Sequence, residues 1–213
     1  MKYNCVIFDC DGVLVDSVEI SIKTLIDMAE SQGVEISYEF AVTNFSGSAL
    51  KKSFDYIEQK GQLKLPETFE GEYRKRTSEA FKKELKPING IHKALEKIPI
   101  PYCVASSGPL SKIEANLNTT NLLDKFKGKM FSSYEIDSWK PDPDIFIHAA
   151  KEMGFKPESC LVIEDSVEGI RAAKQGSFNV LAYANKNNKH ILKQEGVKIF
   201  EDMHDLEYLI DLD

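Results

Sequence analysis

Short apolar runs of strand length alternate with longer amphipathic segments along most of the chain. The clearest strand candidates are residues 3–8, 102–105, 161–163 and 178–182, with two shorter ones at 129–131 and 198–200. Apolar positions recur at helical spacing between these runs, and the predicted helices cover residues 91–98, 110–118, 144–153, 167–175, 189–195 and 203–210. Strands that alternate with helices in this way are typical of an α/β fold. We therefore predict a doubly wound parallel sheet, a Rossmann-like core.

One segment breaks the alternation, because its pattern is helical throughout and contains no convincing strand. Glycine and proline divide it into four predicted helices over residues 17–32, 37–44, 48–59 and 66–85. We expect Ser17 to cap the first of these helices and Gly33 to end it. A chain of 213 residues is longer than one average domain and shorter than two large ones. We therefore predict a core of residues 1–16 and 87–213, interrupted by an all-helical insertion of residues 17–86.

Charge and cysteine content narrow the class of partner. The chain has 34 acidic and 27 basic residues, a formal net charge of −7, which argues against a general nucleic-acid or membrane-surface binder. The four cysteines form no close C-x-x-C pair, so we expect reduced thiols in a cytoplasmic protein rather than zinc or redox chemistry. We expect neither a signal peptide nor a membrane span. A small-molecule partner and a monomeric state are the resulting expectations.

The most unusual stretch joins a buried strand to two acids. The apolar run from Val6 ends in Asp9, Asp11 follows two residues later, and Gly12 lets the backbone turn. Neighbouring carboxylates at a strand end repel each other and are poorly solvated, unless a cation or a shared proton compensates. That cost in free energy makes a chemical role the first hypothesis for this pair, ahead of a role in turns or helix caps.

Polar residues also follow two other predicted strands. Ser106 and Ser107 come after the run at 102–105, and Glu164 and Asp165 come after the run at 161–163. Ligands of open parallel sheets bind beyond the carboxyl ends of the strands, so these groups are expected to converge with the two N-terminal acids. Four carboxylates in one crevice require a hard cation, and an oxygen-rich set suits Mg²⁺. Lys140, in the turn W-K-P-D-P, is the candidate for balancing the remaining charge.

Four motifs in order resemble those of the haloacid dehalogenase superfamily of phosphohydrolases. They are D-C-D-G-V-L-V-D-S at Asp9, S-S-G at Ser106, K-P-D-P at Lys140 and E-D-S-V-E-G-I-R-A-A at Glu164. The helical insertion resembles the cap of the β-phosphoglucomutase-like branch. The runs F-S-S-Y-E-I-D-S-W-K-P-D-P and C-V-A-S-S-G-P further resemble a subgroup of sugar-phosphate phosphatases.

The resemblance implies catalytic roles for four residues. Asp9 attacks phosphorus and forms an aspartyl-phosphate, which splits one difficult displacement into two steps. Asp11 protonates the leaving alcohol and then activates the hydrolytic water. Ser106 hydrogen-bonds the transferring phosphoryl group, and Lys140 neutralises charge on that group and on Asp9.

The resemblance also implies a magnesium site. Its ligands are Asp9, the backbone carbonyl of Asp11, and Asp165, with Glu164 acting directly or through water. Asp165 and Ser166 are also candidates for the N-cap of the following helix. We expect one of them to cap that helix next to the metal site.

Substrate choice is expected to rest with the cap. The segment 45–52 occupies the place of the branch's specificity loop, and Gly47 permits close approach to a ligand. Ser107 is either a substrate contact or a cap of the helix that begins near Pro109. The predicted substrate-binding residues are Gly47, Ser48, Lys51, Arg76 and Ser107, with Lys52, Arg74 and Lys75 as further candidates.

Two departures from the mutase pattern favour hydrolysis. The loop reads Ser46-Gly47-Ser48-Ala49-Leu50 and lacks the arginine that grips the second phosphate in the mutase. The mutase histidine falls at Ser21. We therefore expect a Mg²⁺-dependent phosphatase for a small phosphorylated metabolite, a sugar or sugar-acid phosphate such as 6-phosphogluconate. The alternatives are a β-phosphoglucomutase, a pyrophosphate or nucleotide phosphatase, and a catalytically silent binding module. A dehalogenase is disfavoured, because that branch lacks the second acid that Asp11 supplies.

Overall fold

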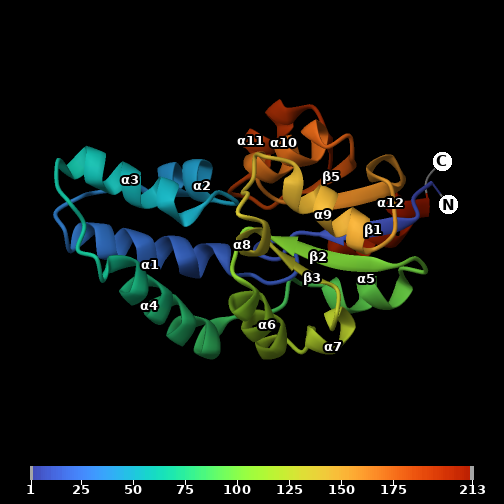
Figure 1. Ribbon diagram of the computed structural model, residues 1–213, viewed down its shortest axis with the longest axis horizontal. Helices are drawn as coiled ribbons and strands as arrows, with labels where there is room; N and C mark the ends of the chain where they lie inside the picture. The colour runs from blue at the N-terminus through green and yellow to red at the C-terminus, as the bar shows by residue number, and fades with distance from the viewer. Residues whose placement is uncertain (1, 212–213) are drawn as a thin grey trace.

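A computed structural model describes residues 2–211 of the chain. Its centre is one six-stranded parallel sheet with the strand order β3-β2-β1-β4-β5-β6. The strands are β1 (Cys5–Phe8), β2 (Tyr102–Ser106), β3 (Met130–Ser132), β4 (Cys160–Glu164), β5 (Asn179–Tyr183) and β6 (Lys198–Phe200). The predicted doubly wound parallel sheet is confirmed (Figure 1).

Strand β1 is buried on both faces because helices cover both sides of the sheet. Its side chains alternate: Val6 and Phe8 join one apolar cluster, and Cys5 and Ile7 join another. The first cluster lies against α5 (Ile91–Lys97), α6 (Leu110–Thr119), α7 (Leu123–Phe126) and α12 (Leu206–Asp211). The second lies against α9 (Asp144–Glu152) and α10 (Val167–Gln175). Figure 1 shows these two helical layers on opposite sides of the sheet.

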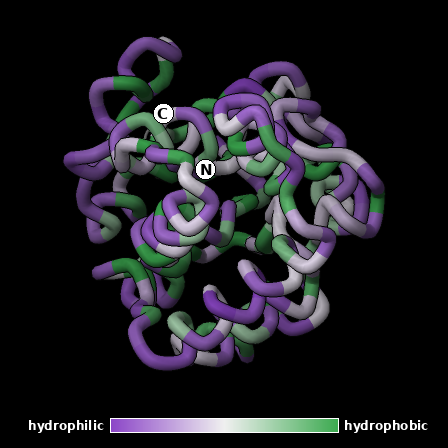
Figure 2. The backbone as a smooth tube through the Cα atoms, turned by 90° about the vertical axis from the view of Figure 1, so that its left-hand side faces the viewer, coloured by the Kyte–Doolittle hydropathy of each residue, from purple (hydrophilic) through white to green (hydrophobic). Residues whose placement is uncertain are grey.

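The helical insertion forms its own apolar cluster, separate from those of the sheet. It comprises α1 (Val18–Glu30), α2 (Tyr38–Phe45), α3 (Leu50–Gly61) and α4 (Phe69–Glu84), which extend to the left of the sheet in Figure 1. Viewed from that side, the backbone carries hydrophilic and hydrophobic residues interspersed (Figure 2). The end of α4 differs, because Phe81 packs with the core of the sheet.

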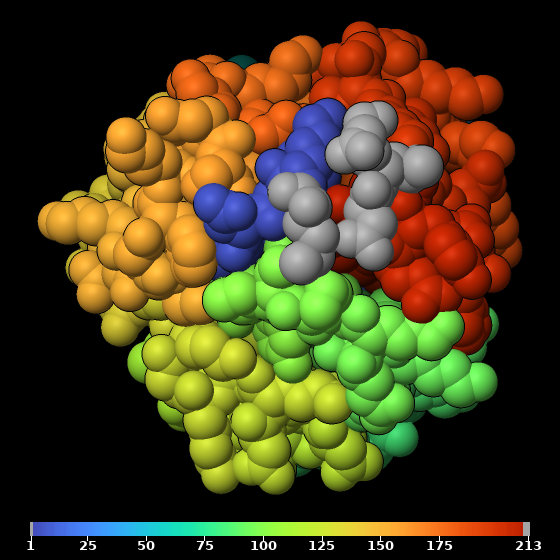
Figure 3. Space-filling model, turned by 90° about the vertical axis from the view of Figure 1, so that its right-hand side faces the viewer, coloured from blue at the N-terminus to red at the C-terminus, as the bar shows by residue number. Residues whose placement is uncertain are grey.

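The chain enters and leaves the insertion at one place. The amide of Asp16 donates to the carbonyl of Lys86 at 2.9 Å, and the amide of Ile88 donates to the carbonyl of Leu14 at 3.0 Å. The two connections therefore run side by side. On the face of the core that lies away from the insertion, the first residues that the structure describes, coloured blue, lie between the orange and red segments (Figure 3).

Some local expectations were wrong or only partly right. Ser17 is the N-cap residue of α1, as expected, but its side chain makes no capping hydrogen bond and donates instead to a carboxylate described below. Gly33 has a positive φ of 77°, but α1 ends three residues earlier and its C-cap is Ser31. The helices α7 and α8 (Ser133–Ile136) were missed because four residues are too few for helical periodicity to be visible. The remaining short helix, α11 (Lys189–Leu192), is continued by a 3-10 turn to Glu195. No helix within residues 2–211 is both long enough and apolar enough to cross a membrane.

Candidate active site

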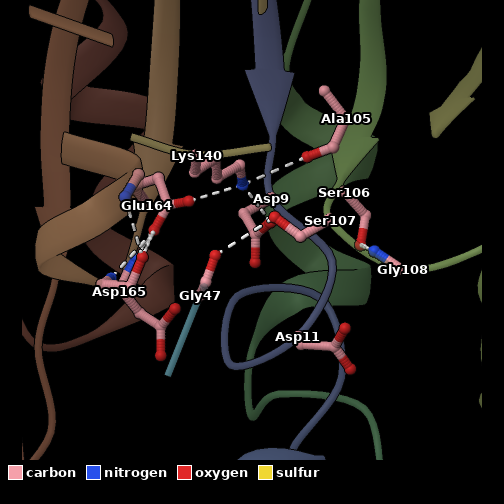
Figure 4. Close-up of polar contacts among 12 residues, drawn as sticks. Asp9, Asp11, Gly47, Ala105, Ser106, Ser107, Gly108, Lys140, Glu164 and Asp165 are labelled. Atoms are coloured by element: carbon pink, nitrogen blue, oxygen red, sulfur yellow. Dashed lines mark hydrogen bonds and ion pairs between the residues drawn. The ribbon is translucent and has the colours of Figure 1, made fainter. Parts of the chain in front are cut away.

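The sheet brings three polar strand ends to one edge. Asp9 directly follows β1, Ser106 ends β2 and Glu164 ends β4. Strand β1 lies between the other two in parallel register, with Phe8 opposite Val104 on one side and Ile163 on the other. The three side chains therefore meet beyond the carboxyl ends of the strands, as Figure 4 shows.

Lys140 lies at the centre of this group (Figure 4). Its ammonium nitrogen is 2.5 Å from Oδ1 of Asp9, 2.6 Å from Oε1 of Glu164 and 3.4 Å from the carbonyl oxygen of Ala105. The ammonium group also lies 4.8 Å from the ring centre of Phe146. The side chain is fully buried, so it is held in one position between two carboxylates that would otherwise repel each other.

Burial and mutual repulsion shape the ionisation of the cluster. Burial raises the pKa of Asp9 to about 7, although the charge of Lys140 opposes this rise. Burial and the nearby Glu164 and Asp9 carboxylates raise the pKa of Asp165 well above its ordinary value. Burial lowers the pKa of Lys140, but the two carboxylates beside it outweigh burial and hold the pKa above its ordinary range. The cluster is thus short of positive charge.

Glu164 is held by the start of α10. Its Oε2 accepts hydrogen bonds from the amides of Asp165 and Ser166 and from the hydroxyl of Ser166, each at 2.8 Å. Ser166 also caps α10 by accepting from the amide of Gly169 at 3.1 Å, so Ser166 and not Asp165 is the helix cap. A Cβ at Gly169 would lie 1.7 Å from Oε1 of Glu164. Only glycine fits there.

Three acids of the cluster have the arrangement of a metal site. Asp9, Glu164 and Asp165 each offer an oxygen, and these oxygens lie within 4.8 Å of one another. Neither oxygen of the buried Asp165 carboxylate accepts a hydrogen bond from residues 2–211. A Cβ at Gly12 would lie 2.1 Å from Oδ2 of Asp165, so that glycine keeps this space open. A buried carboxylate without a donor, beside oxygens of two further carboxylates, fits a hard divalent cation such as Mg²⁺.

The Asp11 side chain does not join this cluster, which corrects the expectation that four carboxylates converge. It points away from Asp9 (Figure 4), accepting from the hydroxyl of Ser17 at 2.5 Å and from the ammonium of Lys112 at 2.7 Å. Burial raises the pKa of Asp11, but the charge and the hydrogen bonds of these partners outweigh burial and lower it. The resemblance assigns the backbone carbonyl of Asp11, and not this side chain, to the metal.

The two serines after β2 have different partners. Oγ of Ser106 accepts from the amide of Gly108 at 3.1 Å. The hydroxyl of Ser107 donates to the carbonyl of Gly47 at 3.1 Å, a contact between the core and the insertion that Figure 4 also shows. Neither serine caps α6, whose N-cap is Pro109.

A cavity of about 450 Å³ lies between the insertion and the sheet, within the range of small-molecule sites. Asp9, Asp11 and Ser106 are at its base. Of the five predicted substrate-binding residues, Gly47, Ser48 and Ser107 line it and the other two do not. Lys51 is exposed and pairs with Asp55 at 2.6 Å; Arg76 pairs with Glu72 at 2.7 Å.

Sequence reasoning missed several lining residues, although helical spacing carried part of the signal. Tyr73, Thr77 and Phe81 were missed; they occupy one face of α4 and line the cavity together with Arg74, which the sequence offered as a further candidate. Arg76 lies about 200° from Arg74 around a helix of 3.6 residues per turn, so it faces away. Lys112 and Tyr134 also line the cavity, but they come from distant parts of the chain and had no local signal.

A buried lysine between two carboxylates at the carboxyl edge of a parallel sheet, beside a cavity under a helical insertion, is an arrangement that fits a hydrolase active site. The model of the haloacid dehalogenase-like hydrolase family matches residues 6–183. The chain belongs to that family, as the four motifs indicated.

Curated relatives of the chain are named phosphatases. It is 34% identical over 193 residues to 6-phosphogluconate phosphatase of Escherichia coli strain K12, covering 90% of this chain and 87% of that protein. It is 27% identical over 179 residues to hexitol phosphatase B of the same strain, with 79% and 78% covered. The enzyme class that the sequence predicts, a phosphoric monoester hydrolase, is the class of these relatives.

Solved structures share the whole fold. A conserved haloacid dehalogenase-like protein of unknown function from Agrobacterium tumefaciens strain C58 superposes with a TM-score of 0.86 at 28% identity, covering 98% of this chain and 97% of that one. A β-phosphoglucomutase-like protein from Bacteroides vulgatus gives a TM-score of 0.81 at 23% identity, with 99% and 88% covered. The insertion is therefore part of a fold shared along nearly the full chain.

Proposed function

We propose that the protein is a Mg²⁺-dependent phosphatase that hydrolyses a small sugar or sugar-acid phosphate, such as 6-phosphogluconate. The observation that carries this proposal is the pairing of Asp9 with Lys140 at the base of the cavity. One oxygen of Asp9 is held by the lysine, and Oδ2 accepts no hydrogen bond within residues 2–211. That oxygen is available for attack on a phosphorus atom.

In the proposed reaction Asp9 attacks the phosphorus and the bond to the substrate oxygen breaks. Lys140 and Ser106 stabilise charge on the phosphoryl group, which is the main requirement of phosphoryl transfer. Asp11 gives a proton to the leaving alcohol and later takes one from the water that cleaves the aspartyl-phosphate. Its carboxylate must first leave Ser17 and Lys112, which hold its pKa low, and take up a proton from water.

We propose that Asp9, Asp165 and the backbone carbonyl of Asp11 hold Mg²⁺. The ion would supply positive charge that screens the attacking carboxylate from the phosphate. Both oxygens of Glu164 already have partners, which favours a water-mediated role for that residue.

We further propose that residues 17–86 act as the cap that selects the substrate. One lining residue supports a polyhydroxy substrate. Asn116 is buried, and its Nδ2 has no hydrogen-bond partner within residues 2–211. An unsatisfied buried donor is costly, and a substrate hydroxyl would satisfy it.

The test is phosphate release from a panel of phosphorylated metabolites, with and without EDTA, by the natural chain and Asp9→Asn. We expect release that needs Mg²⁺ and falls at least about 10³-fold in the variant, as for loss of a nucleophile. The control is Asp55→Asn, an exposed carboxylate on α3.

Each alternative function predicts a different outcome when phosphate release and the sugar phosphate products are both followed. Conversion of β-glucose 1-phosphate to glucose 6-phosphate would indicate a mutase. Preference for pyrophosphate or a nucleotide would indicate a pyrophosphate or nucleotide phosphatase. No release from any ester would leave a binding module.

A further inference from the structure

Arg74 is the cavity cation that stands apart from the reacting carboxylates. Among the described lining residues the cations are Lys112 and Arg74. Lys112 is already paired with Asp11, whereas Arg74 comes from the insertion and contacts neither Asp9 nor Asp11. The cavity thus offers one positive group for an anion other than the phosphate.

The guanidinium of Arg74 is held by one partner in the insertion and one in the core. Its Nε and Nη2 donate to Oε1 of Glu70 at 2.8 and 2.6 Å, on the same helix. Nη2 also donates to the hydroxyl of Tyr134, on the core side, at 2.7 Å. Nη1 has no acceptor among residues 2–211. The planar guanidinium is therefore held in one orientation, and its Nη1 is still able to donate hydrogen bonds.

The core partner of Arg74 is itself well held. Tyr134 lies in α8, whose first turn is closed by a capping box between Ser132 and Glu135. Its ring packs edge-on against Trp139 at a centroid distance of 5.3 Å. A guanidinium placed on such a support loses little further entropy when it binds a ligand.

The acidic partner of Arg74 is easily replaced. Glu70 is 53% exposed and does not line the cavity. An exposed ion pair on one helix is screened by water and contributes little free energy. A carboxylate delivered inside the cavity would be less screened, and it would match the planar fork in a bidentate manner.

We propose that Arg74 is a specificity-determining residue that binds the carboxylate end of a sugar-acid phosphate while the phosphate lies at Asp9. This inference rests on the proposed function, since it assigns the second anionic group of the same substrate. It explains why the insertion places an arginine, rather than a purely polar residue, over a site that already holds the phosphate by other means.

The test compares two ligands of equal chain length that differ at one end. 6-Phosphogluconate carries a carboxylate where sorbitol 6-phosphate carries a hydroxymethyl group. Binding of each is measured by calorimetry with Mg²⁺ to Asp9→Asn and to the double variant Asp9→Asn with Arg74→Met. The matched control adds Arg76→Met instead, which removes an arginine from the same helix that does not line the cavity.

We expect Arg74→Met to weaken binding of 6-phosphogluconate by about 10- to 100-fold, the value of hydrogen bonds to a charged group. Binding of sorbitol 6-phosphate should change by less than about threefold, and Arg76→Met should change neither. In the catalytically active background the loss should appear in KM rather than kcat. Arg74→Lys should restore only part of the discrimination, because lysine lacks the fork.

Equal weakening for both ligands, or the same loss in Arg76→Met, would overturn the inference and assign Arg74 a structural role. Unchanged binding of 6-phosphogluconate would also overturn it. Because binding is measured without turnover, the result is independent of the phosphatase assay. A chain that discriminates through Arg74 but releases no phosphate would contradict the proposed function alone.

Discussion

At the scale of single residues, the site is defined by a shortage of positive charge around Asp9. Lys140 touches two carboxylates, and Asp165 stands nearby without a hydrogen-bond donor for its oxygens within residues 2–211. One lysine thus faces three acids. A divalent cation beside them would remove the imbalance.

This imbalance predicts a pH-dependent effect of Mg²⁺ on stability. The folded chain keeps a proton on Asp9 up to about pH 7, whereas the unfolded chain releases it near 3.8. Across that window the folded state binds more protons, so the stability of the metal-free protein falls as the pH rises. Mg²⁺ needs the charged carboxylate and should raise the unfolding temperature more at about pH 8 than at about pH 5.

The measurement is thermal unfolding with and without Mg²⁺ at both values of pH. Potassium chloride of equal ionic strength controls for screening. An equal increase at the two pH values would contradict the expectation.

At the scale of elements, the position of the start of α10 depends on a glycine as much as on hydrogen bonds. Gly169 lets the helix approach Glu164 so closely that no Cβ fits. The helix N-terminus then supplies amides to that carboxylate, and its macrodipole favours the negative charge.

Gly169→Ala is accordingly expected to destabilise the fold by about 1–3 kcal/mol, as overpacking does, and to reduce turnover by displacing Glu164 from Lys140. Urea unfolding and kcat are the measurements. Gly71→Ala is the matched control, because Gly71 lies within α4 and a Cβ there meets nothing within 4 Å. That variant should be neutral or up to about 1 kcal/mol more stable. Similar unfolding midpoints for both variants would refute the role given to Gly169.

The elements that were predictable from sequence are those with local signals. The strands and most of the helices follow from periodicity, and the acids after β1 and β4 follow from their place at strand ends. Tyr134 and Lys112 had no such signal, because they reach the cavity through tertiary contacts. The basic run at residues 74–76 offered both arginines as candidates, but the helical face decides which one meets the cavity: Arg74 lines it and Arg76 does not.

At the scale of the whole molecule, the insertion is held over the sheet by the packing of Phe81 and by a few polar contacts. Lys52 on α3 pairs with Glu168 on α10 at 2.6 Å, and Ser107 donates to Gly47. Together with Arg74 and Tyr134, these contacts join the two halves around the cavity. The polar contacts are individually weak, so we predict that the halves separate to admit a substrate.

Lys52→Met should therefore favour the open arrangement. We expect KM to rise by up to about fivefold, the effect of one partly exposed ion pair, with the unfolding temperature nearly unchanged. Small-angle X-ray scattering should show a larger radius of gyration in the absence of substrate. Lys51→Met is the control, because that neighbouring lysine pairs with Asp55 on its own helix. An effect of equal size in both variants would mean that the pair with Glu168 does not hold the insertion.

The side-by-side connections at Asp16 and Lys86 have an evolutionary consequence. A segment whose two ends meet can be exchanged or shortened without changing the path of the chain through the sheet. Mutations in the insertion can then accumulate independently of the hydrolytic residues, all of which come from outside it. Under the proposed function, this architecture separates the part of the sequence that is free to acquire new substrates from the part that must keep its chemistry.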